Sequence, residues 1–386
     1  MKFLGYRRPD GRVGIRNHIL ILPTCACASE TCRVVASQLP QAVNIVTQDG
    51  CGEVRGNEKI TQSVLTGFAA NPNVYATVLI GLGCESNSIT AMEDIIRAKT
   101  NKPLHTLVIQ NEGGTVKTIN KAVEIAQGLV QDASRCQREE FDISELMLGI
   151  ECGGSDTTSG LGSNPVVGNT SDRLVDFGGT SMMSETTEFI GAEHLLARRG
   201  ATQEISNKII DICSQLESHI FAAGQDLRTG QPTPGNMDGG LSTIEEKSLG
   251  CIYKGGTRPI VEVLDYAEAP TKKGAVIMDT PGYDIASVSA MIAGGCQVVI
   301  FTTGRGTPTG HAIAPVIKVT ANKETYRMMN DNMDMDLSAV ISGEKTISQM
   351  GEEVLEEIVE VSNGKITKAE AFGFSDIAIN RICKYI

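Results

Sequence analysis

The sequence predicts an α/β protein made of two Rossmann-like domains, each a parallel sheet with helices on both faces. Apolar runs of strand length alternate with segments of helical pattern along most of the chain. The 41 glycines follow no fixed period and belong to turns and close backbone approaches. A polar stretch at residues 132–140 separates two such alternating regions, and we place the domain boundary there.

The first domain is expected to comprise residues 1–135. Ser29 is the expected cap of its first helix. The predicted strands lie near residues 18–23, 43–47, 75–82 and 104–109, and the predicted helices near 29–38, 57–70, 88–98 and 114–133. This order is typical of parallel strands joined by crossover helices.

The second domain is expected to comprise residues 141–386. Its longest irregular stretch, residues 224–240, is predicted to be an ordered, functional loop. The predicted strands lie near 145–151, 180–184, 274–279, 297–302 and 315–320, and the predicted helices near 187–198, 203–222, 242–249, 284–293 and 344–362. The second domain is therefore also α/β.

Composition excludes several functional classes. The net charge of −12 and the absence of Trp argue against a nucleic-acid partner. No apolar run is long enough to span a membrane. The eleven cysteines are an odd number, and no signal-peptide pattern opens the chain, so we expect a cytoplasmic protein rather than a disulfide-bonded secreted one.

Three predicted strands end in a thiol with an acidic neighbour. The thiols are those of Cys51, Cys84 and Cys152. The carboxyl ends of parallel strands meet at one edge of a sheet, so these groups could converge on a crevice and bind a metal ion. The alternative is that each is an inert, buried cysteine.

A glycine-rich turn at residues 301–310 carries Arg305, and we expect this guanidinium to bind a carboxylate. The alternative is a tight turn with a surface arginine. Lys318 is expected near the same crevice, and His311 is expected to face it. Glu185 and Asp279, each at a predicted strand end, are interpreted as metal ligands or bases, or else as helix caps. These residues alone predict an enzyme that acts on a small anionic molecule.

The ordered motifs resemble the altronate/galactarate dehydratase family, which includes the large subunit of sulfolactate sulfo-lyase. The resemblance covers residues 5 to about 370. It rests on Gly5-Tyr-Arg-Arg-Pro-Asp-Gly-Arg-Val-Gly-Ile-Arg-Asn17, Gly81-Leu-Gly-Cys-Glu85, Glu151-Cys-Gly-Gly-Ser-Asp156 with Asn164-Pro165, Gly191-Ala-Glu193, Pro232-Thr-Pro-Gly-Asn236, Glu246-Lys-Ser-Leu-Gly250, Phe301-Thr-Thr-Gly-Arg-Gly306 and Pro315-Val-Ile-Lys318.

The resemblance implies lyase chemistry on a 2-hydroxy acid. A base removes the proton α to the carboxylate, an enolate is stabilised by a metal, expected to be Fe(II) or else Mn(II) or another divalent ion, and the β-substituent leaves. The implied catalytic residues are Glu85, Asp156, Glu185 and Lys318. The implied substrate-binding residues are Asn17, Ser155, Asn236, Lys247, Thr303 and Arg305, and the implied metal ligands are Cys51, Cys84 and Cys152.

The sequence also departs from the family pattern. Only four residues precede Gly5, where single-chain members carry a small N-terminal domain, so we expect a separate small subunit and an oligomeric enzyme. Thr47 replaces a histidine and Met237 replaces a lysine of the family motifs. The leading hypothesis is the large subunit of a sugar-acid dehydratase. The alternatives are a sulfo-lyase that releases sulfite, a sugar-acid binding subunit without catalysis, and an iron–sulfur hydratase.

Overall fold

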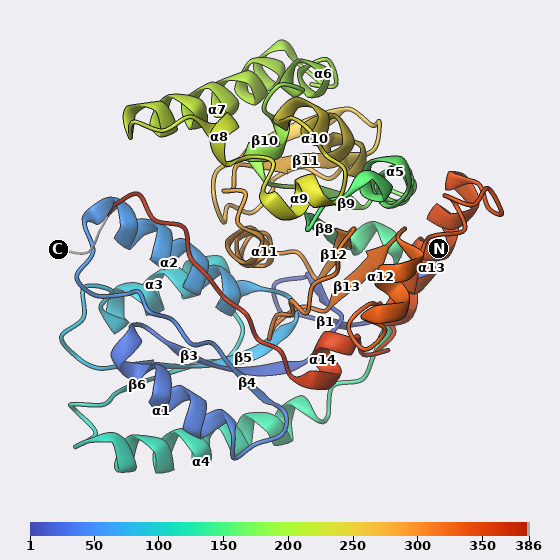
Figure 1. The fold of residues 1–386 in the computed structure, drawn as a ribbon. Coiled ribbons are helices and arrows are strands. Elements are labelled where there is room, and N and C mark those ends of the chain that lie inside the picture. The colour runs from blue at the N-terminus through green and yellow to red at the C-terminus, as the bar shows by residue number, and fades with distance from the viewer. Residues whose placement is uncertain (384–386) are drawn as a thin grey trace.

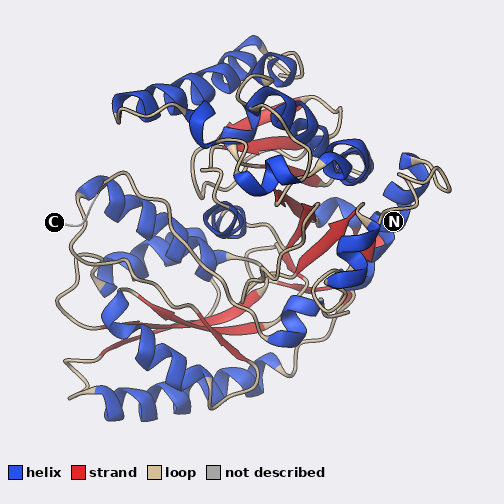
Figure 2. Ribbon diagram, viewed as in Figure 1, coloured by secondary structure: helices blue, strands red, loops and turns tan. Residues whose placement is uncertain are grey.

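The computed structural model describes residues 1–383 and confirms an α/β fold. Helices cover both faces of the parallel sheets (Figures 1 and 2). A small antiparallel sheet of three strands is added to them.

The first parallel sheet has four strands in the order β4-β3-β5-β6. The strands are β3 (His18–Pro23), β4 (Ala42–Asn44), β5 (Val74–Gly81) and β6 (Leu104–Val108). The helices are α1 (Ala26–Ala36), α2 (Arg55–Ala70), α3 (Ile89–Lys99) and α4 (Thr115–Ala133). Ile19 and Ile21 of β3 pack with side chains of α1 and α4, whereas Leu20 and Leu22 pack with those of α2 and α3. This alternation explains why the strand is apolar throughout.

The second parallel sheet has seven strands in the order β10-β11-β9-β8-β12-β13-β14. The strands are β8 (Met147–Gly153), β9 (Thr180–Met183), β10 (Ile260–Leu264), β11 (Ala275–Met278), β12 (Val298–Thr303), β13 (Val316–Thr320) and β14 (Met335–Asp336). The longer helices are α5 (Asn164–Asp176), α7 (Gln203–Ala222), α10 (Ile244–Cys251), α11 (Asp284–Ala293) and α13 (Ile347–Ser362). The shorter ones are α12 (Lys323–Met328) and α14 (Lys368–Phe372).

Several local predictions were wrong. Helix α1 begins at Ala26 with Cys25 as its cap, not Ser29. The helix predicted at 187–198 is two short pieces, η3 (Thr186–Phe189) and α6 (Glu193–Ala197), because Gly191 between them has a φ of 87°. The stretch 224–240 is ordered, as predicted, but it contains two short helices, α8 (Leu227–Gly230) and α9 (Pro234–Asp238), that were not expected.

Other elements were not predicted. Helix α5 and strand β10 were not expected, nor was the antiparallel sheet of β1 (Lys2–Arg7), β2 (Val13–Gly14) and β7 (Glu139–Asp142). The remaining short turns of helix are η1 (Ile143–Glu145), the π-helical η2 (Ser159–Ser163) and η4 (Ile252–Gly255).

The two parallel sheets share one hydrophobic core. Helix α2, from the first half of the chain, packs against α11, from the second. A Cβ atom on Gly67 would lie 2.4 Å from the carbonyl oxygen of Ala293, so the two helices approach closely only because residue 67 is glycine. Asn71 and Asn73 donate from their side chains to backbone carbonyls of the second half. The two halves are therefore joined by apolar and polar contacts.

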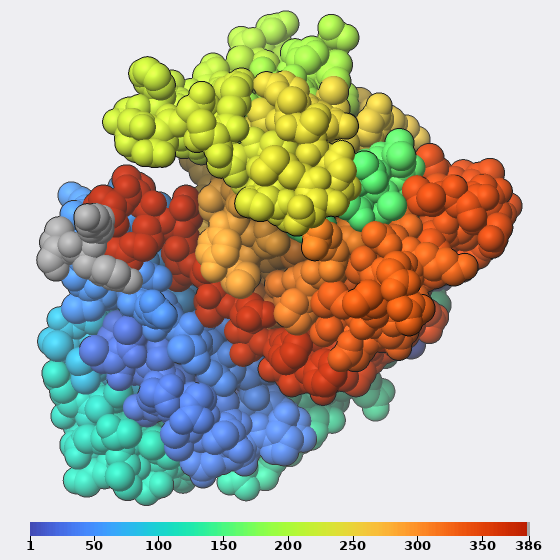
Figure 3. Space-filling model, viewed as in Figure 1, coloured from blue at the N-terminus to red at the C-terminus, as the bar shows by residue number. Residues whose placement is uncertain are grey.

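The C-terminal segment returns across the first half of the molecule. Residues 374–383 run beside α2, and the backbone N–H of Ile382 donates to the Asn57 side chain at 2.7 Å. Arg381 forms an ion pair with Asp49. The surface is hollowed between this red segment and the yellow-green helices α7 and α8 (Figure 3).

Candidate active site

A cavity of about 320 Å³ lies at the carboxyl ends of strands β8 and β12. Helices α9 and α10 and the first turn of α11 complete its wall. The lining residues are Cys152, Gly153, Gly154, Glu185, Thr187, Glu188, Gln231, Thr233, Gly235, Asn236, Lys247, Gly282, Asp284 and Arg305. The cavity is at the sheet edge where open α/β folds bind ligands. Its volume suits a small molecule.

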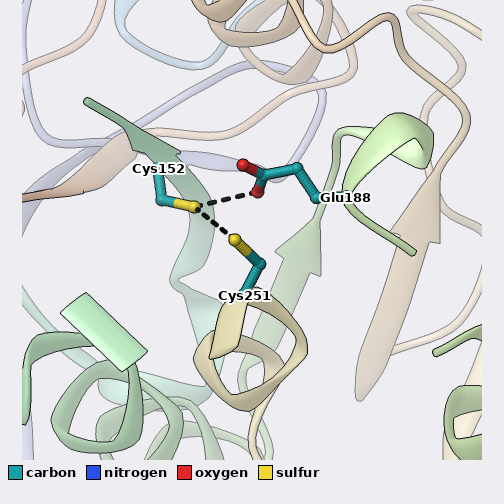
Figure 4. Close-up of side chains that lie close together, drawn as sticks. All are labelled: Cys152, Glu188 and Cys251. Carbon is teal, nitrogen blue, oxygen red and sulfur yellow. Dashed lines mark hydrogen bonds between the residues drawn. The ribbon is translucent and has the colours of Figure 1, made fainter. Parts of the chain in front are cut away.

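Two thiols and a carboxylate meet in the wall of this cavity. The Cys152 thiol donates to Glu188 Oε2 at 2.8 Å, and the Sγ atoms of Cys152 and Cys251 are 3.6 Å apart (Figure 4). All three side chains are buried. Burial, followed by the neighbouring Cys251, raises the pKa of Cys152 well above its usual value.

Lys254 supplies the positive charge of this cluster. Its Nζ atom is fully buried and lies 2.7 Å from Glu185, 2.6 Å from Glu188 and 3.1 Å from Cys152 Sγ. Burial alone would lower the pKa of Lys254, but the thiol and the two carboxylates raise it well above its usual value. The pKa of Glu188 is lowered to about 2, because Lys254 and Lys247 outweigh the effect of burial.

A second group consists of three carboxylates, those of Glu151, Glu185 and Asp284. One oxygen from each lies within 4.8 Å of the others. Ser184 and Ser287 donate to Glu151 Oε2 at 3.2 and 2.7 Å. Burial and the nearby Glu188 raise the pKa of Glu185 to about 8, although Lys254 opposes the shift. A carboxyl with such a pKa can accept a proton near neutral pH.

The backbone is shaped to present Glu185. This residue has a φ of 70°, in the left-handed region that residues other than glycine rarely adopt. The Thr280 hydroxyl accepts from the Glu185 N–H at 2.7 Å, and the Cys152 N–H donates to Glu185 Oε2 at 3.2 Å. A Cβ atom on Gly153 would lie 2.2 Å from Asp284 Oδ2, so this position must be glycine for Asp284 to reach the site.

Five residues predicted from the sequence come together at this cavity. They are Cys152, Glu185, Asn236, Lys247 and Arg305. Lys247 donates to Gln231 at 2.9 Å and lies 3.5 Å from Glu188. Among the described residues that line the cavity, Arg305 is the only cation without a carboxylate partner, since its Nη1 contacts the Gly235 carbonyl at 3.2 Å.

Three further predicted residues lie in the turns beside the cavity. Ser155 Oγ is 4.0 Å from Cys152 Sγ. The Asp156 carboxylate accepts from Thr158, Ser159 and Asn322, so the hydrogen bonds assigned to it organise the turn. Thr303 accepts from the Gly306 N–H at 2.9 Å.

The other predicted residues do not line this cavity. Cys51 and Cys84 are exposed in loops that follow the first sheet, and Glu85 there accepts from Thr24 and the Gly83 N–H. Asn17 bonds to Arg8 and to the Ala133 carbonyl. Lys318 is buried, with Nζ 3.2 Å from the Thr309 carbonyl. Asp279 accepts from the Thr186 hydroxyl.

His311 lies in the shared core, not in the cavity. Its ring packs 5.1 Å from that of Phe68, and its Nδ1 accepts from the Ile313 N–H at 3.1 Å. The prediction that His311 faces the site was therefore wrong. Burial lowers its pKa to about 3.

We expect His311 to make the protein less stable as the pH falls. Between pH 6.5 and 3 the unfolded chain binds a proton at this position that the folded chain does not. Stability relative to His311→Gln should therefore fall by about 1.4 kcal/mol per pH unit below pH 6.5. Urea denaturation of both proteins from pH 7 to pH 5 measures this; a constant difference between them would contradict the buried neutral imidazole.

Several site residues had not been assigned a role from the sequence. Glu188, Cys251, Lys254 and Asp284 belong to helices or helical turns, where acidic and basic residues usually face solvent. Glu151, by contrast, is one of the acidic neighbours of the strand-end thiols that the sequence offered as a possible metal ligand. The Sγ of Cys251 and the Nζ of Lys254 reach the cluster because Gly168 and Gly256 let η4 pack closely against α5.

The described residues could hold a metal ion in either buried group. The Cys152–Glu188–Cys251 group offers two sulfurs and an oxygen, a mixed donor set that suits a borderline divalent ion such as Fe(II). The Glu151–Glu185–Asp284 group offers oxygen only, which suits a harder ion such as Mn(II). Either group could therefore hold a metal ion, although the Lys254 ammonium already contacts Cys152 and Glu188 in the first group and Glu185 in the second.

The fold and this buried acid–base cluster define an α/β enzyme. Residues 143–384 match the family model described as D-galactarate/altronate dehydratase, C-terminal. Residues 5–134 match the model described as D-galactarate dehydratase/altronate hydrolase, second domain. The chain belongs to the galactarate/altronate dehydratase family of lyases, which confirms the resemblance.

The curated relatives bear lyase names. The (2R)-sulfolactate sulfo-lyase subunit beta of Chromohalobacter salexigens is 38% identical over 98% of this chain and 97% of its own length. The altronate dehydratase of Bacillus subtilis is 32% identical over 98% of this chain and 77% of its own length. The galactarate dehydratase (L-threo-forming) of Escherichia coli is 34% identical over 94% of this chain and 73% of its own length. None of the described helices has the length and apolar character needed to cross a membrane.

Proposed function

We propose that this chain is the large subunit of a lyase that removes water from a sugar acid to give a 2-keto-3-deoxy acid. The observation that carries the proposal is that a proton acceptor and a cation without a carboxylate partner line the same cavity. Glu185 lies in the floor of the cavity with its pKa near 8, and Arg305 lies in the wall without a carboxylate partner. This arrangement suits proton removal next to a bound carboxylate.

A residue of this chain can be assigned to each step of the proposed elimination. Arg305 binds the substrate carboxylate, and Glu185 removes the proton from the adjacent carbon. The Lys247 ammonium, kept charged by Glu188, donates a hydrogen bond to the β-hydroxyl, which takes up the proton that Glu185 has accepted and leaves as water. The enol that remains then becomes the keto acid. Fe(II) would be held by Cys152, Glu188 and Cys251, and when bound it would add Lewis-acid stabilisation of the negative charge.

The charges of the cavity favour a monocarboxylic sugar acid such as altronate. A single carboxylate has a partner in Arg305, whereas Lys247 and Lys254 already pair with Glu185 and Glu188. The hydroxyls of a sugar acid can donate to the carboxylates that line the wall. A second anionic group on the substrate, as in a hexarate or in sulfolactate, would meet those carboxylates and be repelled, so the cavity charges favour the dehydratase over the sulfo-lyase.

A second candidate function is sulfite release from sulfolactate. The observation that favours it is the end-to-end match with the sulfo-lyase subunit, whereas the dehydratases are matched over 73–77% of their length. The proton-removal step would be the same, and only the group that leaves would differ. The sulfo-lyase relative is named a subunit, and the dehydratase relatives extend beyond the matched region, so we propose a separate small subunit as the partner of this chain.

A substrate panel distinguishes these functions. The chain would be co-expressed with a candidate small-subunit protein and purified without oxygen. Keto-acid and sulfite formation would then be measured from hexonates, hexarates and sulfolactate, with and without Fe(II). Iron-dependent keto-acid formation from a hexonate supports the dehydratase, sulfite release supports the sulfo-lyase, and no turnover from a metal-free protein contradicts both.

We expect Arg305→Ala to raise KM by about 100-fold or more, because the substrate carboxylate loses its charged, hydrogen-bonded partner. Steady-state kinetics on the active substrate measures this. Arg258→Ala is the matched control, since that arginine pairs with Asp176 on the surface. An unchanged kcat/KM for Arg305→Ala would remove Arg305 from the site.

A further inference from the structure

A second hollow lies on the other side of the thiol cluster, the group formed by Cys152, Cys251 and Glu188. It is a groove of about 280 Å³ between the π-helical turn η2 and helix α10. Lys247 lines both this groove and the catalytic cavity. Cys251 lines the groove, and its Sγ is 3.6 Å from that of Cys152, which lines the cavity. The thiol cluster is therefore a thin wall between the two hollows.

The groove is apolar and open. The side chain of Leu161 is 73% exposed, that of Tyr253 59% and that of Leu249 43%. Leu241 also lines the groove. Large apolar side chains gathered at one exposed place usually mark a surface that another molecule covers. Polar side chains such as Asp156, Glu246 and Lys247 also line the groove, but most of the surface that it exposes is apolar.

Both kinds of relative point to an additional polypeptide as the occupant. The sulfo-lyase relative, matched over 97% of its length, is named a subunit. The dehydratases extend beyond the matched region by about a quarter of their own length. Extra protein therefore accompanies this part of the enzyme in the relatives, either as another chain or as another segment.

We propose that the groove between η2 and α10 is the docking site of the small subunit, which inserts an apolar segment beside Leu161, Leu249 and Tyr253. This inference rests on the two-subunit organisation in the proposed function. The docked segment lies against Lys247 and Cys251 and supports the wall of the catalytic cavity. Removing it exposes this wall to water.

Leu161→Asp tests the proposal directly. Residue 161 is so exposed that the substitution leaves the fold intact, which circular dichroism would verify. We expect affinity for the tagged, co-expressed small subunit to fall by about 30-fold or more, as for the loss of an interface anchor. Phe221→Asp on α7 is the matched control, because Phe221 is 80% exposed but lies outside the groove. It should bind like the unmodified chain.

The outcomes separate this proposal from the proposed function. Equal binding by the unmodified chain and Leu161→Asp overturns the docking site. So does light scattering that shows a dimer of this chain alone which Leu161→Asp dissociates, because a second copy would then occupy the groove. If Leu161-dependent binding is found but no substrate turns over, the docking site stands and only the proposed reaction fails. Arg305→Ala should keep the small subunit bound.

Discussion

Glu185→Gln is expected to lower kcat/KM by about 10³-fold, the usual contribution of a general base. The amide keeps the shape of the side chain but cannot accept the substrate proton. Because the base must be deprotonated, kcat/KM of the unmodified enzyme should rise with pH up to about pH 8 and then level off. The variant should lack this rise.

Glu188→Gln is the matched control for this prediction. Glu188 is one of the charges that raise the pKa of Glu185. Its removal should therefore move the rising limb of the pH profile to lower pH without abolishing it. If Glu185→Gln keeps the limb near pH 8, another group is the base.

Lys254→Met is expected to destabilise the protein by about 3–5 kcal/mol, because it leaves the carboxylates of Glu185 and Glu188 buried without their cation. Thermal unfolding should show a melting temperature lower by roughly 5 °C, because the unfolding entropy of a chain of 386 residues is large. As the pH falls toward 8 the loss should shrink, because without Lys254 the pKa of Glu185 lies still higher and the variant protonates this carboxylate first.

The control for Lys254 is Lys121, whose side chain is half exposed and pairs with Glu112 at 2.8 Å. Lys121→Met should change stability by less than about 1 kcal/mol, because a surface ion pair contributes little. A similar small loss for Lys254→Met would mean that water or a bound ion compensates the buried carboxylates.

The order of strands and helices could be predicted because it depends on local patterns. The buried parallel strands are continuous apolar runs, such as residues 18–23, and strand β3 occupies these residues. Strand β1 escaped prediction because it pairs with β7, more than 130 residues later in the chain. Helix α5 escaped because it begins with Asn-Pro after a glycine-rich turn, a pattern that favours a loop.

The site was predicted only in part, for a related reason. Cys152, Glu185 and Arg305 follow strands, so their position at the sheet edge could be inferred from the sequence. Lys254 and Cys251 do not follow strands. They lie in η4 and at the end of α10, and they reach the cluster because η4 packs closely against α5. Nothing local in the sequence indicates such an approach. Cys51 and Cys84 also follow strands, but these strands belong to the other sheet, and strand-end position alone does not identify the sheet.

The core shared by helices α2 and α11 has a mechanical consequence. A clamshell motion, in which two lobes hinge shut on a ligand, would require Gly67 to separate from Ala293 and would break the Asn71 and Asn73 bonds that cross between the halves. The two halves of this enzyme are instead held together as one rigid unit by these contacts. We expect any closing over the substrate to be a local movement of segments that line the cavity, such as the short α8–α9 region, which contributes Gln231, Thr233, Gly235 and Asn236.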